Sequence, residues 1–130
     1  MIIVLSSTGT DMDSSVDPRF GRCAYYIAYN IDDDSFNAVE NQSRNATGGA
    51  GIQASQAVAE LKADAVITTN IGPNAFRVLE AAGIKDYTGV TGSVKQAIED
   101  FKQGLLGNTE TPNVGEKFGM GKDSGKGGMV

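Results

Sequence analysis

The sequence has no histidine and no tryptophan, and its only cysteine is Cys23. A lone cysteine excludes a disulfide within the chain, and the lack of histidine excludes a zinc site built from cysteine and histidine of one subunit. The same lack removes the most common general base of enzymes. Any bound metal must therefore be held by Cys23, by oxygen ligands, or by residues from more than one subunit.

Basic residues are also few, because 11 Lys and Arg stand against 16 Asp and Glu and give a formal net charge of −5. Proteins bind nucleic-acid backbones through concentrated Lys and Arg, so we expect no nucleic-acid partner. No apolar run has the length needed to cross a bilayer, and residues 1–5 lack the basic segment of a signal peptide. We expect a cytoplasmic protein with no membrane partner.

The first half of the chain predicts three strands. At 130 residues the chain is long enough for one domain with a buried core. Residues 2–5 form a short apolar run, which is typical of a central strand buried on both faces. Residues 24–29 and 35–39 are rich in aromatic and β-branched side chains, and acidic residues 32–34 separate them. This pattern predicts a β-hairpin.

The second half of the chain predicts three helices. Apolar residues recur at helical spacing in residues 50–62, 73–82 and 94–101. Ser93 and Gln96 have the spacing of a capping box at the start of the third of these segments. Each helix would therefore bury one apolar face against the strands.

Two short apolar segments, residues 65–68 and 84–87, alternate with these helices and predict further strands. The predicted order is βββαβαβα, in which the strands that alternate with helices run parallel. We therefore expect an α/β fold with a three-layer mixed sheet. From residue 107 the chain is rich in Gly, Lys and Met and poor in bulky apolar residues. This change divides it into a domain, residues 1–106, and a flexible tail, residues 107–130.

Ligands of open α/β sheets bind beyond the carboxyl ends of the strands, where helix N-termini offer free amide groups. Polar or glycine-rich residues 6–11, 47–51 and 69–74 are expected to meet at that edge. Glycine amides can surround an anion, although glycines of tight turns leave the same pattern, and both interpretations stay open. The candidate anion-binding residues in these segments are Ser6, Gly48, Gly49, Gly51, Asn70 and Gly72.

Two other ligand motifs are incomplete. Residues 49–54 fit the G-x-G-x-x-A fingerprint of dinucleotide binding, but a polar loop stands where the motif needs a strand. Residues 11–17 carry acidic residues at the spacing of a calcium loop, but Val16 replaces the required glycine. The sequence therefore favours neither ligand.

The run from Asp17 to Cys23 is the most distinctive of the chain, because it places two guanidinium groups and a thiol within seven residues. Arg19 and Arg22 can donate to an anion, and their charge would favour the thiolate of Cys23, a soft ligand for iron or an iron-sulfur cluster. A lone cysteine at the start of a strand is also typical of a small buried hydrophobic residue. Both interpretations of Cys23 stay open.

Three motifs occur together in an order and spacing that resemble those of a known family. They are residues 17–22, 48–54 and 70–76. Over about residues 1–105, the chain resembles the dinitrogenase iron-molybdenum cofactor biosynthesis family of small accessory proteins. The resemblance implies a ribonuclease H-like three-layer fold. It also implies binding, carriage or storage of iron-molybdenum cofactor or a related metal-sulfur cluster, by a protein that is not an enzyme.

By position, the resemblance implies that Arg19, Arg22 and the glycines at 48–51 and 72 face an anionic cargo. Cys23 is the one thiolate that the chain can add. A homodimer that brings two copies of Cys23 together would supply a second. The alternative hypothesis is a regulatory or scaffold protein that docks a metal-cluster assembly partner, such as an ATPase.

Overall fold

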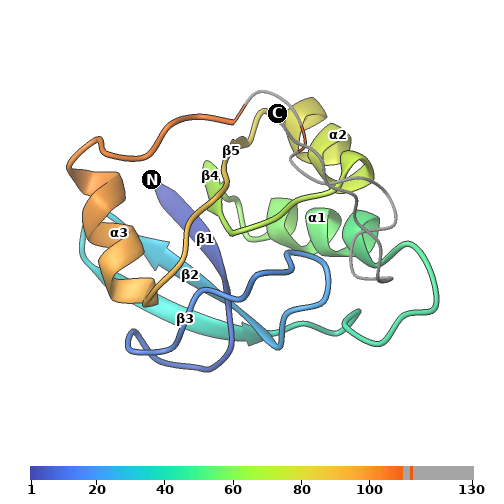
Figure 1. Ribbon diagram of the computed structural model, residues 1–130, viewed down its shortest axis with the longest axis horizontal. Helices are drawn as coiled ribbons and strands as arrows, with labels where there is room; N and C mark the ends of the chain where they lie inside the picture. Colours follow the sequence, from blue (N-terminus) through green and yellow to red (C-terminus); the bar gives the residue numbers. More distant parts are fainter. Residues whose placement is uncertain (110–111, 113–130) are drawn as a thin grey trace.

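The computed structural model describes residues 1–109 and Pro112, which form one five-stranded mixed sheet with three helices (Figure 1). The strands lie side by side in the order β3-β2-β1-β4-β5. The bounds of the elements are β1 Ile2–Ser7, β2 Tyr25–Asn30, β3 Ser35–Glu40, α1 Ala50–Glu60, β4 Ala65–Ile67, α2 Pro73–Ala81, β5 Lys85–Tyr87 and α3 Val94–Lys102. The predicted α/β class with a mixed sheet is confirmed, whereas the ribonuclease H-like designation stays a prediction.

Strand β1 is the centre of the sheet, antiparallel to β2 and parallel to β4. Its apolar residues point alternately to the two faces. Val4 packs in the core cluster that includes residues of α1 and α2, and Ile3 and Leu5 pack in the cluster that includes residues of α3. The interpretation of this run as a strand buried on both faces is therefore confirmed.

The predicted hairpin is present as β2 and β3, joined by the acidic turn. Asp34 adopts a left-handed conformation with φ of 60°, and its amide donates to the Asn30 carbonyl at 2.8 Å. The carboxylate of Asp33 caps the start of β3 by accepting from the amide of Ser35 at 3.0 Å. Strand β3 is an edge strand whose six residues are all exposed.

The helices cover both faces of the sheet and make three layers, with α1 and α2 on one face and α3 on the other (Figure 1). Helices α1 and α2 approach closely at Gly51, where a Cβ atom would lie 3.4 Å from the Cβ of Ala75. The Ser55 hydroxyl joins them by donating to the carbonyl oxygens of Gly51 and Ala75. No helix within residues 1–109 is long and apolar enough to span a bilayer.

Only half of the predicted capping box forms at the start of α3. The Ser93 hydroxyl accepts from the Gln96 amide at 3.0 Å, as the spacing predicts. The Gln96 side chain instead donates to Asp100 at 2.9 Å, one turn further along the helix. In a complete box the side-chain oxygen of Gln96 would accept from the Ser93 amide, but donation to Asp100 holds this side chain along the helix instead.

The first residues of the segment predicted as a tail pack on the sheet. The Thr109 amide donates to the Asp86 carbonyl at 2.6 Å, and the hydroxyls of Thr109 and Thr88 lie 2.8 Å apart. This pairing covers part of the outer edge of β5. Apart from Pro112, the rest of the predicted tail lies outside the described residues.

Candidate anion-binding site

The loop after β1 is fastened to the loop after β4 at the carboxyl edge of the sheet. The Asn70 amide donates to the Pro18 carbonyl at 3.1 Å, and the Asn70 side chain donates to the same carbonyl at 2.9 Å. The Phe20 amide returns a bond to the Asn70 carbonyl at 3.4 Å. Two segments about 50 residues apart in sequence are thus held side by side, as the topology predicts.

Arg19 lies in the middle of this pairing with its backbone fixed and its side chain exposed. Its amide donates to the Asp17 carboxylate at 2.9 Å, and its backbone forms a bridge with Asn70. The guanidinium makes no hydrogen bond or ion pair with any other residue of the described chain. The backbone is therefore positioned while the charge stays available.

Arg22, a predicted anion-binding residue, contacts the loop that leads into α1. Its Nη1 donates to the Arg44 carbonyl at 2.9 Å, which ties the 17–24 loop to the loop that leads into α1. Arg22 thus positions a loop in this structure, and its remaining donors are the ones that stay available for an anion.

Ser6 also serves the fold. Its hydroxyl is fully buried, donates to the Asp17 carbonyl at 2.8 Å and lies 2.7 Å from the hydroxyl of Thr68. These partners use its hydrogen-bonding capacity inside the protein, so the hydroxyl cannot reach a ligand in this arrangement. Ser6 thus holds residues 17–24, which we call the arginine loop, against the end of β4.

The predicted glycines divide into two groups. Gly48 and Gly49 are exposed ahead of α1, and Gly49 has φ of 72°, a conformation that other residues adopt rarely. Gly51 faces α2, where an added Cβ would lie 3.4 Å from the Cβ of Ala75, and Gly72 precedes α2 with an ordinary φ of −87°. Neither N-cap side chain bonds to the first turn of α1 or α2, and Pro73 at the start of α2 has no N–H, so the remaining amides of these turns are the candidate donors to an anion.

Gly21 is a residue that the sequence interpretation missed. A Cβ atom on it would lie 3.1 Å from both Cα and N of Gly51. Only glycine lets the arginine loop approach the first turn of α1 this closely. Contacts of Gly21 with Gly51 and of Gly51 with Ala75 join the starts of both helices to the arginine loop. We call Arg19, Gly49, Gly51, Asn70 and Gly72 the carboxyl-edge site.

Asn41 was missed as well, although it holds the far end of the same loop. Its side chain is buried and donates to the carbonyls of Gly21 and Cys23 at 3.0 and 2.9 Å. A buried asparagine outside an apolar pattern leaves no periodic signal in a sequence. Its role appears only when its backbone partners are known.

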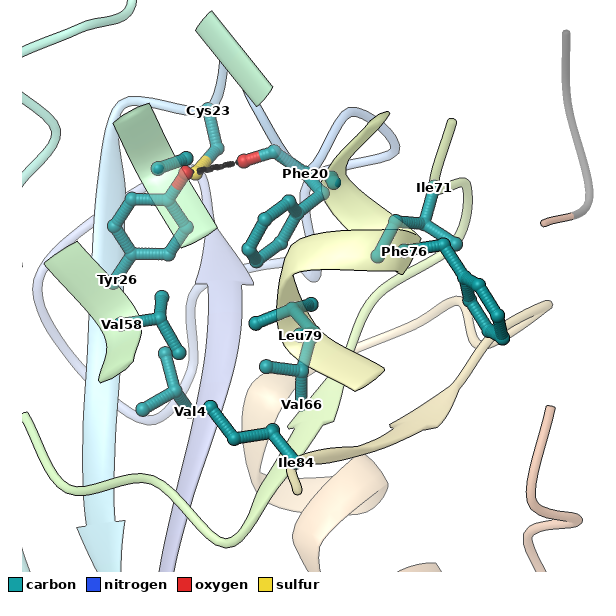
Figure 2. Packing of buried hydrophobic residues seen from close by; sticks show 12 residues of the cluster. Val4, Phe20, Cys23, Tyr26, Val58, Val66, Ile71, Phe76, Leu79 and Ile84 are labelled. Atoms are coloured by element: carbon teal, nitrogen blue, oxygen red, sulfur yellow. Dashed lines mark hydrogen bonds between the residues drawn. The ribbon is translucent and has the colours of Figure 1, made fainter. Parts of the chain in front are cut away.

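Cys23 is a core residue with 0% exposure, packed in the cluster of α1 and α2 (Figure 2). Its thiol donates to the Phe20 carbonyl at 3.5 Å, and the Tyr26 hydroxyl donates to the same oxygen. Burial raises the pKa of the Cys23 thiol to about 11, because a thiolate would lose its hydration. This environment supports the interpretation of Cys23 as a buried hydrophobic residue. Within the described residues, no cluster of three or more His, Cys, Asp or Glu side chains is arranged to hold a metal.

Comparisons with known proteins agree over almost all of the described chain. A family model described as dinitrogenase iron-molybdenum cofactor matches residues 1–104. The apo form of the orange protein from Desulfovibrio gigas is similar in structure, with a TM-score of 0.85 and 35% identity over 87% of this chain and 96% of that chain. A Thermotoga protein provisionally named a NifB protein has a TM-score of 0.74 and 34% identity over 87% of this chain and 98% of its own. An uncharacterized protein of Methanocaldococcus jannaschii is 31% identical over 97 residues, 72% of this chain and 82% of that protein.

Proposed function

The chain belongs to the dinitrogenase iron-molybdenum cofactor family, and on this premise we propose that it binds an anionic metal-sulfur cluster, iron-molybdenum cofactor or a relative of it, at the carboxyl-edge site. The observation that carries the proposal is the Arg19 guanidinium, which is exposed without a partner in the described chain while its backbone is bonded on both sides. The fixed backbone places this cation at the carboxyl edge, so that binding has to order only its side chain.

The cargo is held by charge and by amide donors in this proposal. Arg19 supplies the charge, and the uncapped first turns of α1 and α2 supply N–H groups beside it. Cys23 takes no part, because its thiol is buried and its raised pKa keeps it protonated at neutral pH. Binding without thiolate ligation would let the cargo be released intact, which is what carriage or temporary storage requires.

Binding without catalysis is part of the same proposal. Ser6 and Ser7, the hydroxyls at the end of β1, are fully buried and bonded inside the protein. A hydroxyl becomes a nucleophile when an adjacent base activates it and a substrate can reach it. Neither hydroxyl meets the second condition. The orange protein, a relative in structure, is known in an apo form, that is, without a bound group, which also favours binding.

We also propose that the chain described here acts in the cytoplasm.

A second candidate function is docking of a metal-cluster assembly partner, such as an ATPase, and the observation that favours it is β3. All six residues of this edge strand are exposed, including Phe36 at 39% and Val39 at 36%. An open edge with apolar side chains can add a strand from another protein. In this scaffold hypothesis the carboxyl-edge site would carry no cargo.

The test is anaerobic reconstitution with iron, sulfide and molybdate, followed by desalting, metal analysis and a visible spectrum. Native protein is compared with Arg19→Ala, Cys23→Ala and Lys95→Ala, the last being a control that removes an exposed charge from α3. We expect Arg19→Ala to retain about tenfold less metal, the effect of losing one charge-assisted interaction. Cys23→Ala and Lys95→Ala should match the native protein.

Each other outcome has a distinct meaning. Loss of metal in Cys23→Ala alone would show thiolate ligation and contradict the proposed mode of binding. No retention in any variant would reject the cargo hypothesis and leave the scaffold. Equal retention in all four would show that Arg19 does not hold the cargo.

A further inference from the structure

A cavity of about 440 Å³ lies between β5 and the second half of α2. It shares no residue with the carboxyl-edge site, so it is a separate feature of the molecule. The residues that line it are Phe76, Glu80, Gly83, Ile84, Lys85, Asp86, Asn108 and Thr109.

Asp86 is the unusual member of this lining. It pairs with Val66 across the sheet, and Val66 belongs to the core cluster of α1 and α2, so the carboxyl group points to the α2 side. Asp86 is only 2% exposed, and its Oδ1 has no hydrogen-bond partner among the described residues. Buried carboxyl groups are nearly always paired, because an unpaired one loses its hydration without compensation.

The other charged groups at the cavity do not compensate Asp86. Glu80 on α2 is exposed and adds a second negative charge. Burial first, and then the charge of Glu80, raise the pKa of Asp86 to about 7. Lys85 is exposed and forms no ion pair within residues 1–109, and alternation along β5 directs its side chain away from that of Asp86. Within the described residues, Asp86 and Glu80 therefore have no cationic partner, although Lys85 also lines the cavity.

The chemistry of the lining distinguishes between two kinds of cation. Magnesium and calcium take six or more oxygen ligands, and no cluster of three or more acidic, cysteine or histidine side chains in the described chain could hold a metal. A volume of about 440 Å³ lies within the range of pockets that hold small organic molecules. Phe76 and Ile84 give the cavity an apolar wall beside the carboxyl group.

We propose that this cavity binds a small organic cation, a primary ammonium group on a short apolar body. The ammonium group pairs with the carboxyl group of Asp86, and the apolar body packs against Phe76 and Ile84. Glu80 at the cavity adds long-range attraction. The site is independent of the cluster cargo proposed above, so either can be present without the other.

The experiment is an NMR titration of the full chain at pH 8 with n-butylammonium chloride, in parallel with n-butanol and with magnesium chloride. We expect n-butylammonium to shift the amide signals of Asp86 and Thr109 and to lower the pKa of Asp86 measured from its carboxyl carbon. Asp86→Asn should weaken binding by about tenfold or more, as expected for loss of a charge-assisted bond. Glu80→Gln should weaken it by about twofold, and Glu60→Gln, a control at the far end of α1, should leave it unchanged.

Several results would overturn the proposal. Equal binding of n-butanol and n-butylammonium would show an apolar cavity without a role for the charge. A response to magnesium alone would identify a metal site instead. Unchanged affinity in a folded Asp86→Asn chain, or no shift with n-butylammonium at concentrations up to about 0.1 M, well beyond typical fragment affinities, would remove the site altogether. Should Asp86→Asn not fold, Glu80→Gln against Glu60→Gln carries the same comparison.

Discussion

Replacing Asp86 with asparagine should make the protein more stable at pH 8, although the change touches a buried polar residue. The reason is that the ionised carboxyl has no partner for Oδ1 in the described chain and is 2% exposed. Its pKa is raised from 3.8 to about 7, first by burial and then by Glu80. The native state therefore binds this proton more tightly than the unfolded state does.

The sign of the pH dependence follows from this difference. Below about pH 4 Asp86 is protonated in both the native and the unfolded state, so it contributes nothing to the pH dependence of stability. Between about pH 4 and 7 only the native state holds the proton, so stability falls as pH rises. Above about pH 7 the loss is complete, with an upper limit of about 4 kcal/mol for a pKa that moves this far. About two thirds of this pH window lies above pH 5, and water in the adjacent cavity screens the charge. We therefore expect Asp86 to lower the free energy of unfolding by about 2 kcal/mol between pH 5 and 8.

Urea unfolding of native protein, Asp86→Asn and Glu60→Gln at pH 5 and pH 8 measures this effect. The advantage of Asp86→Asn over native protein should grow by about 2 kcal/mol between the two values of pH. Glu60→Gln, which removes an exposed carboxylate, should run parallel to native protein. If Asp86→Asn also runs parallel to native protein, Asp86 is ionised at its ordinary pKa and the argument from burial is refuted.

Three further predictions concern the residues around the carboxyl-edge site and α3. Gly21→Ala should cost about 1–3 kcal/mol in thermal unfolding, because the added Cβ would lie 3.1 Å from the backbone of the first turn of α1; Gly48→Ala, with nothing within 4 Å, should cost nothing measurable, and equal losses would contradict the packing. Ser93→Ala should cost about 1 kcal/mol in urea unfolding through loss of the cap; Gln96→Ala should cost clearly less, since its side chain does not complete the box. Cys23 should react with a thiol-specific reagent at pH 8 only as fast as the protein unfolds, because its thiol is buried and its pKa is about 11; rapid reaction of folded protein would contradict this.

The elements of the fold could be predicted from the sequence because each leaves a local pattern. These patterns depend only on residues close together in the sequence. They are the apolar run of β1, the acidic turn before β3 and the helical spacing of α1 and α2. The confirmed strands and helices differ from the predicted bounds by one or two residues, where capping and pairing decide the end.

The candidate site was predictable only in its location. Topology brings Arg19 and Asn70 together, but whether a side chain faces solvent depends on residues far away in the sequence. The Ser6 hydroxyl is hydrogen-bonded to the Thr68 hydroxyl inside the protein. The Arg22 guanidinium donates to the Arg44 carbonyl. Asp86 was missed for the same reason, since a single acid in a short strand has no periodic signal, and only the tertiary structure shows that it lacks a partner.

The two edges of the sheet are unequal, and this inequality limits how copies of the chain can associate through strands. The outer side of β5 is met by Thr109, whereas β3 pairs only with β2 in the described sheet. A sheet with two open edges can propagate head to tail without limit. With β5 partly covered, β3 is the more open edge of the described sheet, and pairing of two β3 strands would leave only the partly covered edges free. Self-association through strands would therefore favour a twofold pair over a filament.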